Sequence, residues 1–146
     1  MKKKAIIVDL DGTLADITHR RKYVEGQKKD WKNFNKNIIK DDLNGWCAEI
    51  IRRMISDHHV LLVSGRTDEL KEETEAWLKK HDVPYTDLIM RKNKDHRDDT
   101  IVKREIYEQK IKPMYDVLFV IDDRAKVVKM WRETGLVCLQ CDWGEF

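Results

Sequence analysis

The sequence predicts an α/β fold, in which a doubly wound parallel sheet carries a small helical insertion. Short apolar runs alternate with amphipathic segments along the chain, which favours repeated strand–helix–strand units with right-handed crossovers. The apolar runs are rich in Val, Ile and Leu and lack regular polar alternation, as expected for strands that are buried on both faces. Acidic residues follow two of these runs, at the edge where open α/β sheets bind their ligands.

The individual elements follow from this alternation. Strands are expected at the apolar runs, residues 4–8, 60–63, 87–90, 117–121 and 136–139. Helices are expected at the segments between them, residues 43–55, 70–81, 99–110 and 124–134. We expect Asp68 to cap the second helix and Gly135 to end the fourth.

Residues 16–41 break the alternation, because they are polar and separate the first strand from its crossover helix. We interpret them as a small helical cap insertion that stands over the end of the first strand. The whole chain, residues 1–146, is then a single domain, since 146 residues suffice for one core and are few for two.

Composition narrows the class of protein. The net charge of +2 gives no overall bias towards nucleic acid or membrane. Only four apolar residues follow the basic residues 2–4, too few for an export signal or a membrane span, so a cytoplasmic protein without membrane contact is expected. An odd number of cysteines argues against a disulfide framework, and Cys138 and Cys141 are expected to pack on opposite faces of a strand.

The first apolar run ends in Asp9-Leu10-Asp11-Gly12-Thr13, which places two carboxylates at the carboxyl end of a buried strand. Two acids this close suit a magnesium ion, a nucleophile for phosphate, or an acid/base pair. The pentapeptide alone does not choose among these three uses.

The second run ends in Ser64-Gly65-Arg66, where a hydroxyl and open backbone amides are able to hold a phosphate oxygen. The alternative is an ordinary turn at the start of a helix.

Lys103 lies one turn into the third predicted helix. It is either a solvated lysine or, if the helix start faces the same edge, a charge that neutralises phosphate and carboxylates.

The fourth run ends in Asp122-Asp123, two adjacent acids that repel one another unless a cation is shared. Beside Asp9 they would complete an oxygen-rich site suited to Mg²⁺. The alternative is a pair of N-cap carboxylates for the helix that begins near Arg124.

Taken in order on one sheet, these four motifs resemble those of the haloacid dehalogenase (HAD) superfamily. The resemblance implies a Rossmann-like sheet and a Mg²⁺-dependent phosphomonoester hydrolase that acts through an aspartyl-phosphate. It implies Asp9 as nucleophile, Asp11 as proton carrier, and Ser64 and Lys103 as catalytic groups that offset phosphoryl charge. The implied metal ligands are Asp9, Asp122, Asp123 and the backbone carbonyl of Asp11. Because the two acids of the first motif need different protonation states, we expect a raised pKa for Asp11 in the free enzyme.

A narrower resemblance covers nearly the full chain. The four motifs, together with residues 97–103, 130–132 and 144–146, are similar to the phosphatase domain of bacteriophage polynucleotide kinase–phosphatase. That family removes 3′-phosphates from nucleic-acid ends, and the resemblance implies substrate-binding roles for the residues Thr13, Arg20, Gly65, Arg66 and Asp99. No GxxxxGK[ST] P-loop occurs here, so the kinase half is expected to be absent and a separate polynucleotide kinase or ligase to act as partner.

The predicted cap is basic. Residues 16–41 contain eight Lys/Arg and four Asp/Glu, a net charge of +4, which leaves −2 for the rest of the chain. Tyr23, Trp31 and Phe34 interleave with the basic residues and are either stacking platforms for bases or the small core of the cap itself. Residues 19–22 are the expected substrate contacts, because they lie closest in sequence to the first motif.

Three functions therefore compete. The first is a 3′-phosphatase for DNA or RNA ends, and the second is a phosphatase of small nucleotides such as a 5′-mononucleotidase. The third is a catalytically silent nucleic-acid-binding module. Asp9, Asp11, Lys103 and Asp122 weigh against the third, because a binding module does not need all four.

Overall fold

A parallel five-stranded sheet forms the centre of the protein. The computed structural model describes residues 1–145, so that Phe146, the last residue of the 144–146 motif, lies outside it. The strands follow the order β5-β4-β1-β6-β7, and all four neighbouring pairs are parallel. Their bounds are β1 (Lys3–Val8), β4 (His59–Thr67), β5 (Asp87–Arg91), β6 (Tyr115–Arg124) and β7 (Cys138–Gly144). The doubly wound parallel α/β fold that the sequence predicts is confirmed.

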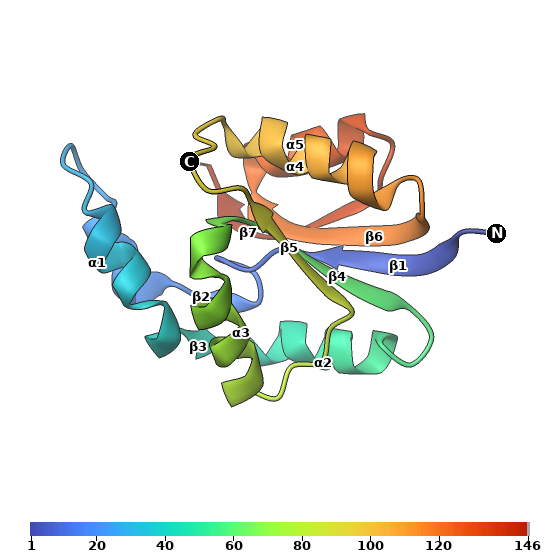
Figure 1. Ribbon diagram of the computed structural model, residues 1–146, viewed down its shortest axis with the longest axis horizontal. Helices are drawn as coiled ribbons and strands as arrows, with labels where there is room; N and C mark the ends of the chain where they lie inside the picture. The colour runs from blue at the N-terminus through green and yellow to red at the C-terminus, as the bar shows by residue number, and fades with distance from the viewer. Residues whose placement is uncertain (146) are drawn as a thin grey trace.

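Helices cover both faces of this sheet, which explains why the strand sequences are continuously apolar. Figure 1 shows α2 (Gly45–Met54) and α3 (Lys71–Lys80) on one face, and α4 (Asp99–Ile106) and α5 (Ala125–Glu133) on the other. Each face has its own cluster of buried apolar side chains. Fully buried tryptophans, Trp77 of α3 and Trp131 of α5, are the largest side chains of the two clusters.

The polar segment after β1 forms a separate small layer. Two short strands, β2 (Ala15–Asp16) and β3 (Asp42–Leu43), pair in antiparallel fashion at its base. Between them lie the 3₁₀ helices η1 (Thr18–Tyr23) and η2 (Ile38–Lys40) and the single α-helix α1 (Trp31–Lys36). Figure 1 shows this segment beyond the carboxyl end of β1, so it stands beside the edge where the motifs collect.

Several boundaries differ from the sequence prediction. β4 and β6 extend through the second and fourth motifs, because Thr67 still pairs with Arg91 and Arg124 still pairs with Gly144. The third helix ends at Ile106 and continues as the π-helical segment η4 (Tyr107–Ile111).

The prediction that Asp68 is the N-cap residue of α3 is wrong. The 3₁₀ helix η3 (Asp68–Leu70) precedes α3, and the Asp68 carboxylate accepts instead from the backbone N–H of Asn93 at 3.0 Å. A contact between distant loops has therefore replaced the local cap that the sequence suggests.

Other local predictions are confirmed. Gly135 has a φ of +94° just after the end of α5, the left-handed conformation that ends many helices. Cys138 belongs to the α4/α5 cluster, whereas Cys141 packs against the cluster on the opposite face. Within residues 1–145, none of the helices combines the length and apolar character that a membrane span requires.

Candidate active site

The strand order places three motifs side by side. β1 lies between β4 and β6 in the parallel sheet, so the carboxyl ends of all three strands meet at one edge. Asp9 follows β1 directly, Ser64 lies near the end of β4, and Asp122 and Asp123 lie near the end of β6. The fourth component, Lys103, reaches this edge from the first turns of α4.

Three buried carboxylates converge at this edge. Asp9, Asp122 and Asp123 each offer an oxygen that lies within 4.8 Å of the other two. The Lys103 ammonium is also buried and donates to Asp9 Oδ1 at 2.8 Å and to Asp122 Oδ2 at 3.0 Å. The alternative of N-cap carboxylates is wrong, because α5 begins without a side-chain cap.

The proton affinities of this cluster reflect its excess of negative charge. Burial and the neighbouring Asp122 raise the pKa of Asp9 well above its usual value, and Lys103 offsets this only in part. Burial likewise raises the pKa of Asp123. Burial opposes the charge of Lys103, but Asp122 and Asp9 outweigh it and raise the lysine pKa. The cluster has three acids and one ammonium. Because its carboxylates are not fully neutralised, it offers negatively charged oxygen ligands to a hard cation.

Glycines permit the close packing around these acids. A Cβ at Gly12, where φ is +84°, would lie 2.2 Å from Asp123 Oδ2. A Cβ at Gly144 would lie 1.9 Å from the backbone carbonyl oxygen of Asp123. Thr13 completes the enclosure, since its hydroxyl lies 3.1 Å from Asp9 Oδ2 and donates to it. The first motif therefore packs against the Asp123 carboxylate, whereas β7 packs against the Asp123 backbone.

Asp11 lies apart from the other acids. Its carboxylate accepts from Arg20 Nη2 at 2.7 Å and from Arg66 Nη2 at 2.5 Å. Burial disfavours its charge, but Arg66 and Arg20 outweigh that effect and lower the pKa of Asp11 to about 2. The expectation of a raised pKa for Asp11 in the free protein is therefore wrong, because two guanidinium groups that the sequence did not link to it stabilise its anion.

A further acid, Asp41, organises these arginines, and sequence reasoning missed it. Its carboxylate is buried and accepts from Arg20 Nε at 2.7 Å, from Arg20 Nη2 at 2.8 Å and from Arg66 Nη2 at 3.5 Å. His19 Nε2 lies 2.7 Å from the same carboxylate. No motif marks Asp41, since it comes at the end of the polar insertion and reaches Arg66 only through the fold.

Asp99 and Gly65 are also brought together. A Cβ at Gly65 would lie 2.5 Å from Asp99 Oδ1, and the Asp99 carboxylate is bound by Arg91 and by Arg124. Arg91 Nε donates to the carbonyl of Gly65 at 2.8 Å, another contact that no sequence signal announces. Ser64 is buried nearby, and its hydroxyl oxygen accepts from the backbone N–H of Arg66 at 3.1 Å.

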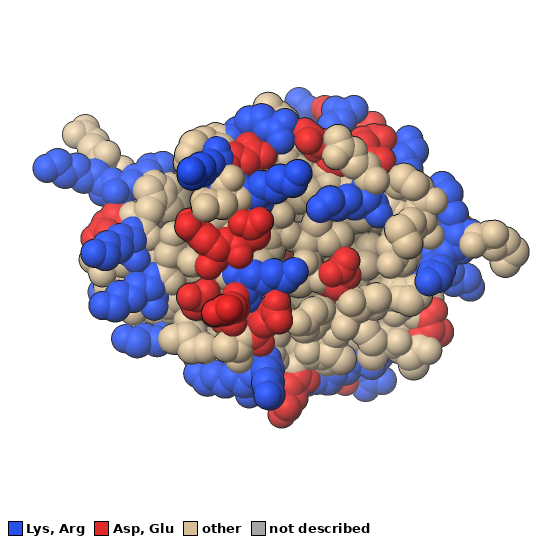
Figure 2. All heavy atoms as spheres, viewed as in Figure 1, with Lys and Arg blue, Asp and Glu red and all other residues tan. Residues whose placement is uncertain are grey.

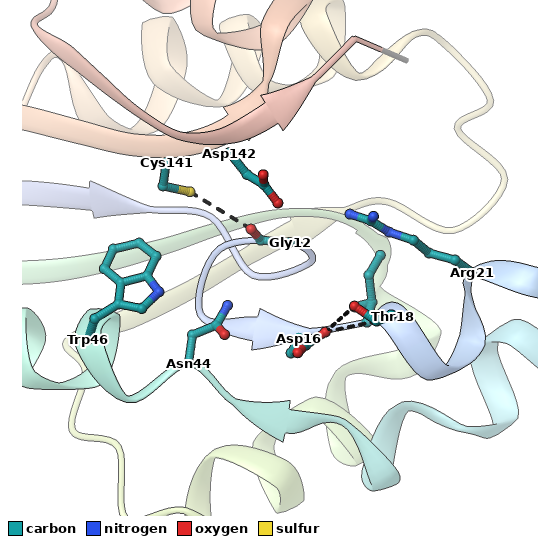
Figure 3. A pocket seen from close by; sticks show the side chains of 9 residues that line it. Gly12, Asp16, Thr18, Arg21, Asn44, Trp46, Cys141 and Asp142 are labelled. Atoms are coloured by element: carbon teal, nitrogen blue, oxygen red, sulfur yellow. Dashed lines mark hydrogen bonds between the residues drawn. The ribbon is translucent and has the colours of Figure 1, made fainter.

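Residues 19–22, the expected substrate contacts, lie in different environments. Arg20 is fully buried and His19 pairs with Asp41, whereas Lys22 is exposed with its ammonium 5.2 Å from the Tyr23 ring. Arg21 lines a cavity of about 180 Å³. Figure 3 shows this cavity between the first-motif loop and β7, and its other lining residues are Gly12, Asp16, Ile17, Thr18, Asn44, Trp46, Cys141 and Asp142.

A family model of the polynucleotide kinase PNKP phosphatase domain matches residues 3–146. The chain belongs to this family. The resemblance to the HAD superfamily that the motifs suggest is thus confirmed.

Solved and curated relatives agree with the assignment. A chain in the structure of the Pnkp1/Rnl/Hen1 RNA repair complex is 36% identical with a TM-score of 0.88, over 99% of this chain and 44% of that one. A protein of Autographa californica nuclear polyhedrosis virus, named as a bifunctional polynucleotide kinase/RNA ligase, is 29% identical over 133 residues. That match covers 89% of this chain and 18% of the viral protein, so both relatives are much longer.

A more distant structure supports the fold alone. A hydrolase from Streptococcus pneumoniae TIGR4 has a TM-score of 0.62 at 17% identity, and the match covers 97% of this chain and 94% of that one.

Proposed function

We propose that this protein is a Mg²⁺-dependent phosphomonoester hydrolase that removes 3′-phosphates from nucleic-acid ends through an aspartyl-phosphate. One observation carries the chemical part of the proposal. Asp9 directly follows the central strand with one oxygen 2.8 Å from Lys103, inside a cluster with Asp122 and Asp123 that holds more acid than its lysine neutralises.

The metal part rests on the donor set. Asp9, Asp122 and Asp123 offer only carboxylate oxygens, which suit Mg²⁺, and the backbone carbonyl of Asp11 is the further ligand that we assign by family resemblance. When bound, Mg²⁺ supplies positive charge that lets Asp9 ionise and that polarises a phosphoryl group. Gly12 and Gly144 leave room for Asp123 in this set, since a Cβ at Gly12 would overlap its carboxylate and a Cβ at Gly144 would overlap its backbone.

The nucleophile in this proposal is an Asp9 carboxylate oxygen. It attacks phosphorus, the bond from phosphorus to the 3′-oxygen breaks, and the leaving oxygen takes a proton from Asp11. A water molecule then attacks the phosphorus of the aspartyl-phosphate and gives its proton to Asp11, which releases inorganic phosphate and restores Asp9. Lys103 offsets the negative charge of the phosphoryl oxygens.

Asp11 needs a proton for the first step, and the free protein holds it as an anion. A substrate phosphate competes for the guanidinium groups of Arg20 and Arg66, because both are the donors that a dianion attracts most strongly. Drawing them towards phosphate weakens their hold on Asp11 and makes its protonated form accessible. In this proposal Arg20 and Arg66 therefore bind the substrate phosphate and, by the same shift, allow Asp11 to take up a proton.

The substrate part of the proposal rests on the family assignment and on the charge of residues 16–41, which we propose as a cap. The longer relatives are named for polynucleotide kinase and RNA ligase functions and for an RNA repair complex. By analogy, we propose that this domain works with a polynucleotide kinase and a ligase that repair nucleic-acid ends.

The test measures phosphate release from a 3′-phosphorylated oligonucleotide, a 5′-phosphorylated oligonucleotide and a 5′-mononucleotide, each with Mg²⁺ and with EDTA. We expect the 3′-phosphorylated strand to be preferred by about tenfold or more, equivalent to about 1.4 kcal/mol in transition-state binding. A preference for the mononucleotide would replace the proposal by a nucleotidase. Metal-independent release, or none from any substrate, would contradict the chemistry itself.

A further inference from the structure

The outer side of the proposed cap carries lysines without acidic partners. Five exposed lysines lie in the segment from η1 to the end of α1, and none forms an ion pair within residues 1–145: Lys22, Lys28, Lys29, Lys32 and Lys36. Figure 2 shows Lys and Arg side chains gathered at the end of the molecule that α1 occupies in Figure 1. Two acids, Glu25 and Asp30, lie among these lysines, and the Asp30 carboxylate already accepts from the backbone N–H of Asn33 at the start of α1.

The structure separates the three aromatic residues of this segment. Phe34 is buried and Tyr23 is half-buried against the core, so both belong to the internal packing of the cap. Trp31 is 54% exposed and presents its ring to solvent among the lysines, with the Lys29 ammonium 5.9 Å from the ring centroid. Of the two roles that the sequence leaves open, Trp31 fits the stacking role and the other two fit the core.

Trp31 is also connected to the active site through the interior of the cap. Its ring lies edge-on to Phe34 with centroids 5.5 Å apart, and the Arg20 guanidinium lies 4.2 Å from the centroid of Phe34. Arg20 in turn donates to Asp11 at 2.7 Å. Two side chains thus separate the exposed ring from the proposed proton carrier, a span that a strand covers with a few nucleotides.

We infer that this cap face, defined as Trp31 and the five lysines, binds the nucleotides that precede the phosphorylated end of a single-stranded substrate. A base stacks on Trp31, and the lysines contact the backbone phosphates. Stacking accepts any base, and lysines accept any phosphate, so the surface suits strand recognition without sequence preference. This inference rests on the proposed function, since it extends the substrate from the terminal phosphate to the strand behind it.

The first test compares kcat/KM for a 3′-phosphorylated single-stranded decamer with kcat/KM for a nucleoside 3′-monophosphate. The ratio of the two values isolates the contribution of the strand. We expect W31A to lower this ratio by about tenfold, within the range for the loss of one stacked base, and W31F to recover most of it. An unchanged ratio would overturn the inference. An equal loss on both substrates would also do so, because Trp31 would then act only by supporting Phe34 and Arg20.

The second test uses two triple variants with the same loss of charge. K28Q/K29Q/K32Q removes lysines of the cap face, whereas K2Q/K3Q/K4Q removes three exposed lysines at the amino end of β1, the opposite end of the strand from the site. For the decamer, the slope of log Kd against log salt is expected to fall by about 2 in the cap variant, from three contacts at about 0.7 each. The control variant should keep the parental slope. Equal slopes in the two variants would refute a role for the cap face.

Binding separates the inference from the proposed function. Kd for a fluorescent decamer is measured by anisotropy in EDTA, which requires no turnover. If the protein binds the decamer through Trp31 and the lysines but releases no phosphate, the inference stands and the proposed chemistry fails. If it hydrolyses both substrates equally and W31A binds the decamer like the parent, the chemistry stands and the inference fails.

Discussion

Replacing Lys103 by methionine tests whether the buried acids need a cation. Methionine has a similar length but no charge, so K103M leaves Asp9 and Asp122 facing one another without the ammonium that now lies 2.8 and 3.0 Å from them. The Lys103 side chain is only 4% exposed, so water replaces little of the lost interaction. Removing one partner of a buried ion pair costs about 3–5 kcal/mol, a large part of the stability of about 5–15 kcal/mol typical of such domains.

Thermal unfolding in EDTA measures this cost. A loss of that size corresponds to a fall in Tm of about 10 °C for a domain of this length. Excess Mg²⁺ is expected to return most of the loss, because a cation held by the same carboxylates replaces the missing charge. Mg²⁺ should therefore raise the Tm of K103M by more than it raises the Tm of the parent.

The dependence on pH has a definite sign. Folding raises the pKa of Asp9, so its contribution favours the folded state at low pH and is lost as pH rises through the raised value. Lys103 lowers the pKa of Asp9, so removing Lys103 raises this pKa further. The loss of stability with rising pH then continues to a higher pH. In EDTA, the gap in Tm between K103M and the parent should widen as the pH increases.

A surface lysine provides the control. Lys112 pairs with Glu108 at 3.5 Å with its side chain 57% exposed, so K112M should change stability by no more than about 1 kcal/mol. If K103M unfolds at the parental temperature in EDTA at alkaline pH, or if Mg²⁺ fails to stabilise it more than the parent, the cluster does not act as a cation site.

Three further predictions concern single positions. Asp9→Asn should retain the parental circular dichroism spectrum and lower kcat by about 10³-fold or more, since an amide of the same shape is not a nucleophile; hydrolysis of p-nitrophenyl phosphate at the parental rate would exclude Asp9. Asp41→Asn should cost about 3 kcal/mol in urea unfolding and lower kcat at least about tenfold, because the buried Arg20 guanidinium loses one of its two charged partners and keeps only Asp11; a parental value for both would show that Asp41 does not hold the arginines. Gly144→Ala should cost about 1–3 kcal/mol and weaken Mg²⁺ stabilisation, since its Cβ would press on Asp123. Gly45→Ala is its control, because a Cβ there meets no atom within 4 Å.

The sequence predicts the part of the site that strands position. Apolar runs locate the strands, and the parallel arrangement brings Asp9, Ser64 and Asp122 to one edge without any knowledge of side-chain contacts. Lys103 was accessible by the same logic, since the helix that carries it begins at that edge.

The contacts that the sequence did not reveal are long-range ion pairs. Asp41 reaches Arg66 across 25 positions, and Asp99 reaches Arg124 across the same separation, with no periodic pattern to announce either contact. The protonation of Asp11 was mispredicted for this reason, because its pKa depends on arginines that converge only in the fold. The roles of Trp31 and Phe34 likewise required burial, which residue type alone does not determine.

The strand order also bears on how the protein reaches its working state. Asp9 meets Lys103 across 94 positions, and Thr13 meets Asp123 across 110, so the site depends on contacts of very high sequence separation. Such topologies fold slowly, because distant segments must be joined before their contacts stabilise them. During synthesis Asp9, the proposed nucleophile, emerges well before its partners on β6. Recovery of the proposed phosphatase activity after dilution from denaturant should therefore coincide with the slowest phase of refolding, which would make turnover a reporter of completed folding.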